Sequence, residues 1–224
     1  MPRPHRYAGG FGIIEFAVAI IILGMVFLFA LRGTTLIAPL RSYVVAQQIN
    51  QYRSAVLQYQ ADLMHLPGDD SVAPDRWGRP PALFSMLGST ISSAGNGKID
   101  GLLDDSANAS GEQYMAWRDL RLGGYVEGDK NLVGQSARPE NTYGGVFGFA
   151  ADNFGVEQVL CLTKVPGTDA ALLDKRLDDG SISAGRLQGT SRWDPVDAHN
   201  HFEKADTAAY DPEKTYIICL PYLP

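Results

Sequence analysis

An almost unbroken apolar run from Phe11 to Leu31 dominates the amino-terminal end of the sequence. Its length matches the ~20 residues that an α-helix needs to span the hydrocarbon core of a membrane. A single acid, Glu15, interrupts the run. Because a carboxylate inside a spanning helix costs about 2.5–3.5 kcal/mol at the centre and less near the end, we treat Glu15 as a functional residue that needs a cationic partner.

A short basic leader, residues 1–10, precedes the apolar run. Basic flanks face the cytoplasm, so the rest of the chain is expected on the other side of the membrane. No small-x-small cleavage site follows the run, which argues against a secretory signal peptide. The small pair Gly9-Gly10 lies before the run instead. A cut after Gly10 would create an α-amino group at Phe11, one helical turn from Glu15, and would supply the missing cation.

The helical pattern continues beyond the apolar run and stops at Leu66-Pro67-Gly68. A helix from Phe11 to His65 would be ~82 Å long, so most of it would lie outside a hydrocarbon core of ~30 Å. Its outer part carries one apolar stripe, which is expected to pack on a sheet. The members of this stripe are Val45, Ile49, Tyr52, Val56, Tyr59 and Leu63.

We therefore divide the chain into a leader (1–10), a long helix (11–66) and a globular head (67–224). Within the long helix, 11–31 is predicted to be transmembrane and 32–66 to form an exposed stem. The head is expected to be α+β, with strands near 145–150, 156–163 and 215–220 in a mostly antiparallel sheet. Two short helices are expected in the head, one opened by a capping box of Ser110 and Gln113 and one running from about Thr168 to Gly180.

Cys161 and Cys219 are the only cysteines, and both lie in apolar, strand-like segments. In an exported protein, two such cysteines favour a disulfide, the alternative being two buried free thiols. Their spacing matches no CxxC metal or redox motif.

The amino-terminal segment resembles that of type IV prepilins and type II secretion pseudopilins: a basic leader, Gly10 before Phe11, and an acid as the fifth residue after the cut. The chain departs from this family at Gly12-Ile13, where Thr-Leu is common. The resemblance implies that a prepilin peptidase cuts after Gly10 and methylates the amine of Phe11. It also implies that Glu15 neutralises the terminal amine of a neighbouring subunit during filament assembly.

The head extends the resemblance, because the strings LPGDD, GNGKIDG, EQYMAWRDLRLGGYVEG and LLDKRLDDGSISAGR are similar to those of bacterial prepilin-like proteins. The fold implied is type IV pilin-like, a long amino-terminal helix with a transmembrane first half packed on a small α+β head. In such heads a disulfide commonly joins the carboxy-terminal part to the sheet, a role that Cys161 and Cys219 would fill.

The function expected from these features is a structural, non-enzymatic subunit of a type IV pilus-like or type II secretion pseudopilus filament. The expected partners are the inner membrane, a prepilin peptidase, other pilin or pseudopilin subunits and a pilus assembly platform. The expected location is a single pass through the bacterial inner membrane with the head in the periplasm, followed by a periplasmic or extracellular filament. Two alternatives stay open: a minor tip pilin with an adhesive or DNA-uptake role, and a membrane-anchored periplasmic binding or enzymatic domain.

Other chemistry has weaker support. A net charge of −6 argues against nucleic acid as a partner, and no hydrolase, phosphate-loop or zinc-protease motif is present. The loop GNGKIDGLLDD echoes an EF-hand and suggests calcium ligands at Asn96, Asp100 and Asp104 or Asp105. However, the first, third and twelfth ligand positions fall on Ser92, Ala94 and Leu103, so a glycine-rich turn is the favoured interpretation.

Two further polar segments are expected to be structural, so no cofactor is expected. Asp178-Asp179-Gly180 is interpreted as a helix end and turn. The segment around His199 offers metal-ligand types but no period that would fix their geometry, and it is interpreted as an exposed loop; its candidate ligands are Asp197, His199, His201 and Glu203.

Overall fold

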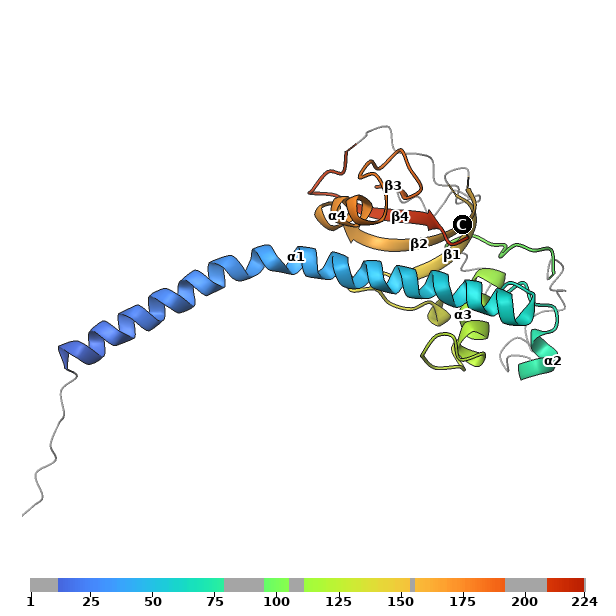
Figure 1. Cartoon of the computed structure of the whole chain (residues 1–224), viewed down its shortest axis with the longest axis horizontal. Helices are drawn as coiled ribbons and strands as arrows, with labels where there is room; N and C mark the ends of the chain where they lie inside the picture. The colour runs from blue at the N-terminus through green and yellow to red at the C-terminus, as the bar shows by residue number, and fades with distance from the viewer. Residues whose placement is uncertain (1–11, 79–94, 105–110, 154–155, 192–208, 224) are drawn as a thin grey trace, which may run out of the picture. The chain divides into compact units, whose positions relative to one another are not determined.

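The structure is a computed structural model, and it describes residues 12–78, 95–104, 111–153, 156–191 and 209–223, without the side chains of 30–38, 152, 153 and 157. The chain divides into two compact units, 1–40 and 41–224. The described elements are helices α1 (Ile13–Leu63), α2 (Ala73–Trp77), α3 (Glu112–Leu122) and α4 (Gly167–Leu177), the 3-10 helix η1 (Gly134–Ala137), and strands β1 (Phe147–Asn153), β2 (Val156–Pro166), β3 (Gln188–Thr190) and β4 (Thr215–Pro221). Figure 1 labels the α-helices and the strands.

The first unit consists, in its described part, of the amino-terminal portion of α1. Glu15 lies in the first turn of this helix. The large apolar side chains from Ile13 to Phe29 are highly exposed, with fractions that range from 49% at Val18 to 89% at Ile13. This segment therefore presents apolar surface around most of its circumference.

No helix in the described parts of the chain is both long enough and apolar enough to cross a membrane. The predicted fold class, a type IV pilin-like helix with a transmembrane first half at 11–31, is therefore wrong. The predicted location, a single pass through the inner membrane with a periplasmic head, is wrong for the same reason.

The second unit is built on the other half of α1, whose apolar stripe is buried. Val45, Ile49, Val56 and Tyr59 have no exposed surface, and Tyr52 has 8%. The ring of Tyr52 meets those of Trp117 on α3 and Phe147 on β1 edge to face, with centroids 5.0 and 4.9 Å apart. The helical stripe thus forms one wall of the main core, as its period of 3.6 predicts.

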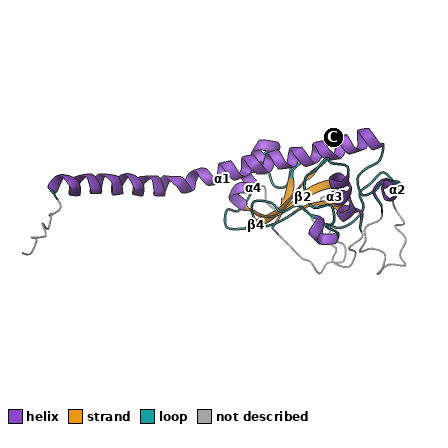
Figure 2. Cartoon of the chain, turned by 90° about the horizontal axis from the view of Figure 1, so that it is seen from below, coloured by secondary structure: helices purple, strands orange, loops and turns teal. Residues whose placement is uncertain are grey.

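The opposite wall of this core is a four-stranded antiparallel sheet with the strand order β1-β2-β4-β3. Figure 2 shows the second half of α1 running along one face of this sheet. Alternate residues of each strand point to opposite faces, so Phe147 and Phe149 enter the main core while Ala150 joins a smaller apolar cluster with Cys161 and Cys219. The sequence patterns placed β1, β2, β4 and α4 near their observed bounds, but they did not predict β3 or α2.

The segment between α1 and α3 is held by a buried carboxylate. Asp69 is 2% exposed and accepts hydrogen bonds from three successive backbone amides, those of Gly95, Asn96 (2.9 Å) and Gly97 (2.6 Å). Positive φ angles of 93° at Gly95 and 86° at Gly97 turn these amides toward one point, forming a concave anion site of the kind called a nest. Asp69 therefore fixes the GNG loop onto the segment that follows α1.

Candidate functional site

Glu15 lies at the amino-terminal end of α1, where the helix has unsatisfied amide groups. Its Oε2 accepts a hydrogen bond of 2.8 Å from the backbone amide of Gly12. The partial positive charge of a helix amino terminus also favours an acid in the first turn. In the sequence, Glu15 follows by four residues the position where a cut after Gly10 would leave a terminal amine. Gly10 and Phe11 lie outside the described residues, so cleavage and methylation stay predictions.

The first part of α1, around and after Glu15, carries a long run of exposed apolar side chains. Its bulky members include Ile14, Phe16, Leu23 and Phe27, each more than half exposed. Contiguous apolar surface of this size is typical of sites that bind another apolar surface. This segment is therefore suited to bind another apolar surface. The carboxylate of Glu15 near its start can pair with a cation on that surface.

A second group of acids lies buried where α1 ends. Asp70 accepts hydrogen bonds from the Tyr59 hydroxyl (2.8 Å) and the Val72 amide (2.9 Å), and it pairs with Arg76. Burial alone would raise the pKa of Asp70, but these three contacts outweigh burial and lower the pKa below its ordinary value. Asp70 is thus a charged anchor of the α1–α2 connection.

For Asp119 on α3, the effect of burial on the pKa outweighs that of its contacts. Asp119 is 1% exposed, and burial raises its pKa to about 7 against the opposing effects of the Gly68 amide and Arg118. The Gly68 amide donates a 2.9 Å hydrogen bond to Oδ2, whereas the Arg118 guanidinium is 3.9 Å from Oδ1. Asp119 is therefore a buried acid that titrates near neutral pH, a property that its place in the sequence does not reveal.

The predicted disulfide between Cys161 and Cys219 is confirmed. The two residues are directly opposed on β2 and β4, and both are buried. The bond closes a loop with a sequence separation of 58, and it ties the last strand to the centre of the sheet. The alternative of two buried free thiols is excluded.

Loss of this disulfide is expected to destabilise the head by about 2–4 kcal/mol, because the reduced unfolded chain regains the entropy of a long open loop. Urea unfolding of the full chain with and without reductant would measure the difference. The matched control is the double variant Cys161→Ala and Cys219→Ala, which should be insensitive to reductant. Equal stability of the oxidised and reduced wild-type chain would contradict this prediction.

The three predicted calcium ligands each have a hydrogen-bond partner within the protein. The side-chain Nδ2 of Asn96 donates to Asp100 Oδ2 (2.7 Å), and the side-chain Oδ1 of Asn96 accepts from the Lys98 backbone amide (2.8 Å). Asp104 instead accepts from Gln135 (2.6 Å) and lies 3.7 Å from Arg138. Each of these oxygens thus contributes to turn structure or charge balance, while the alternative ligand Asp105 lies outside the described residues.

A different acidic cluster is better grouped, and sequence reasoning missed one of its members. Asp174, Asp178 and Asp179 bring carboxylate oxygens within 4.8 Å of one another, the one such group of acids, histidines or cysteines in the described parts of the chain. The four-residue spacing of Asp174 and Asp178 on a helix was the available signal. Their oxygens are already engaged by donors of the following turn and by a tyrosine, namely the amides of Gly180, Ser181, Arg186 and Leu187 and the hydroxyl of Tyr210.

This cluster therefore organises the end of α4, in keeping with the helix end and turn expected at Asp178-Asp179-Gly180. Burial raises the pKa of Asp174, against hydrogen bonds from Tyr210 and Gly180 that lower it. The candidate metal ligands Asp197, His199, His201 and Glu203 lie outside the described residues. Comparison of the chain with models of protein families, with curated proteins and with solved structures finds no match.

Proposed function

We propose that this chain is a structural subunit of a filament of the type IV pilus or type II secretion pseudopilus class. The observation that carries the proposal is the contrast between the two halves of α1. The second half is buried against its own head, whereas the first half, from Ile13 to Phe29, exposes its apolar side chains and begins with Glu15. The first halves of neighbouring copies cover one another in the filament.

Burial drives this assembly. Covering a single Leu, Ile, Val, Phe or Met side chain contributes about 1.5–3 kcal/mol, and the exposed segment has more than ten such side chains to offer. Association costs about 4–15 kcal/mol in lost freedom of motion. Burial of only some of these side chains between two copies is therefore enough to offset that cost, and the rest are covered by further copies.

Glu15 gives the assembly its register. A prepilin peptidase cuts after Gly10, and the new amine of Phe11 on one copy pairs with the carboxylate of Glu15 on the next. An uncompensated carboxylate within packed apolar helices is strongly unfavourable. A copy that is displaced along the filament axis loses the ion pair and therefore binds more weakly. An assembly platform adds processed copies one at a time.

Mass spectrometry of the chain isolated from its native host is expected to find an amino terminus at Phe11 with one added methyl group on the amine. The predicted cause is removal of residues 1–10 before assembly. The variant Gly10→Val should retain the leader, because a branched side chain obstructs the peptidase at the scissile bond. A mature chain that starts at Met1, or at a residue after Leu31, would contradict the proposal.

A further inference from the structure

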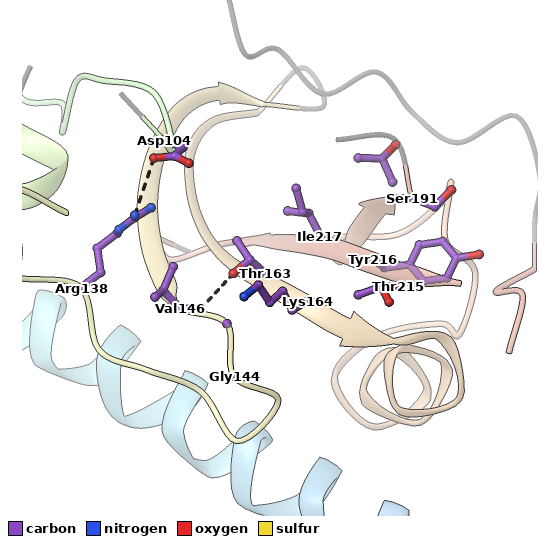
Figure 3. Close-up of a pocket in the computed structure, with 12 residues that line it drawn as sticks. Asp104, Arg138, Gly144, Val146, Thr163, Lys164, Ser191, Thr215, Tyr216 and Ile217 are labelled. Atoms are coloured by element: carbon purple, nitrogen blue, oxygen red, sulfur yellow. Dashed lines mark hydrogen bonds and ion pairs between the residues drawn. The ribbon is translucent and has the colours of Figure 1, made fainter. Parts of the chain in front are cut away.

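A cavity of about 460 Å³ opens on the sheet in the second unit. Figure 3 shows its walls, to which β2 contributes Thr163 and Lys164, β4 contributes Thr215 and Ile217, and the turn before β1 contributes Val146. Ile217 also belongs to the small apolar cluster that contains the disulfide. The cavity thus lies on a part of the sheet that the disulfide holds in place, and its volume is within the ~300–1,000 Å³ of small-molecule sites.

Lys164 is held at this cavity by an unusual backbone. Its φ angle is +59°, one of two positive values at non-glycine residues in the described chain. The register between β2 and β4 shifts between Leu162 and Val165, so Lys164 occupies a β-bulge. Bulges re-aim side chains and are frequent beside functional sites, and left-handed backbone at a residue other than glycine is strained. Backbone conformation alone would favour glycine at this position rather than lysine.

The charges that line the cavity do not cancel. The Arg138 guanidinium is balanced by Asp104 at 3.7 Å and donates to the Leu103 carbonyl oxygen at 2.8 Å. Lys164 is exposed, and no carboxylate of the described residues forms an ion pair with it. Among the described residues that line the cavity, the positive charge of Lys164 is therefore not balanced, and it can attract an anion.

Residues with hydroxyl side chains line the same cavity. The Thr163 hydroxyl oxygen accepts a 2.9 Å hydrogen bond from the Val146 amide, and a hydroxyl that accepts one bond can also donate one. The hydroxyls of Ser191 and Thr215 also line the cavity, and both residues are exposed. Val146 and Ile217 add an apolar wall. Hydroxyls beside an apolar surface suit a ligand that carries several hydroxyl groups on a carbon ring.

We propose that this cavity binds a small carboxylate with several hydroxyl groups, of the chemical class of sugar acids. Lys164 pairs with the carboxylate, Thr163, Ser191 and Thr215 bind hydroxyl groups, and Ile217 contacts the ring. The proposal uses residues of the second unit alone, so it stands or falls independently of filament assembly.

The test is calorimetric titration of the full chain with D-galacturonate, with D-galactose and acetate as partial ligands. Galacturonate is expected to bind saturably and at least about tenfold more tightly than either partial ligand, because only it uses both the cation and the hydroxyls. No saturable binding of galacturonate would overturn the proposal. Binding of galactose or acetate as tight as that of galacturonate would overturn it too.

Variants of Lys164 locate the site. Lys164→Gln is expected to weaken galacturonate binding about tenfold or more, the loss typical of a hydrogen bond to a charged group, while the exposed Lys130→Gln should leave it unchanged. Lys164→Gly is the second variant, because glycine adopts the positive φ without strain and should preserve or raise stability to urea. If Lys164→Gln and Lys164→Gly both bind galacturonate as tightly as the wild type, the assignment is wrong.

Discussion

Replacing Glu15 by Gln is expected to abolish filament assembly while the head stays folded. Breaking a buried ion pair costs about 3–5 kcal/mol, which corresponds to a loss of more than about a hundredfold for each contact between copies. The head should be unaffected, because Glu15 belongs to the first compact unit and accepts a hydrogen bond from Gly12, the residue that precedes α1. Electron microscopy and the amount of sedimentable filament would measure the loss.

Two controls make this result specific. Glu127→Gln removes an exposed acid of the head and should leave the number of filaments unchanged. The cut at Gly10 should still occur in the Glu15→Gln chain, so a retained leader would shift the explanation to processing. Normal filaments from a correctly processed Glu15→Gln chain would remove the ion pair from the assembly mechanism.

Asp119→Asn is expected to raise the free energy of unfolding at pH 8 by about 4 kcal/mol. Burial raises the pKa of Asp119 from 3.8 to about 7 in the folded chain, and each pKa unit corresponds to about 1.4 kcal/mol. Asparagine can still accept the hydrogen bond from the Gly68 amide and carries no charge to desolvate. The substitution therefore removes the cost of a buried carboxylate without removing its structural contact.

The pH dependence gives this prediction its sign. The folded chain holds the proton more tightly than the unfolded chain, so the stability associated with protonated Asp119 is fully present below pH 3.8 and is lost as the pH rises to about 7. Urea unfolding followed by tryptophan fluorescence should show equal stability of variant and wild type near pH 4 and a growing advantage of the variant up to pH 7. A constant difference from pH 4 to pH 8 would contradict the buried-acid account.

Much of the head follows from short-range patterns. The stripe from Val45 to Tyr59 has the period of a helix, and the observed α1 buries it. The segments around Cys161 and Cys219 have the residues of buried strands, and they form β2 and β4. Such patterns were readable because a repeat of 3.6 or 2 residues reports directly which face of an element is buried.

The amino-terminal segment shows where such patterns mislead. Its apolar composition alone predicted a membrane span, whereas no helix in the described chain satisfies both length and hydropathy. An apolar composition indicates that a helix surface is buried away from water, but it does not identify the partner. Lipid and a second apolar helix remove the same apolar area from water. The proposed function therefore rests on the exposure of this segment and on the position of Glu15, and assembly must be tested directly.

By itself, the sequence determined the order of the main helices and strands, the apolar face of each, and the two cysteines available for a bond. Only the tertiary structure decided which distant groups come together: Asp69 with the Gly95–Gly97 amides, Asp119 with Gly68, and Lys164 with Ser191 and Thr215 along the walls of one cavity. The physical reason is that periodicity is a local property of the chain. A pKa, a nest or a binding cavity depends instead on burial and on neighbours that are separated by tens of residues.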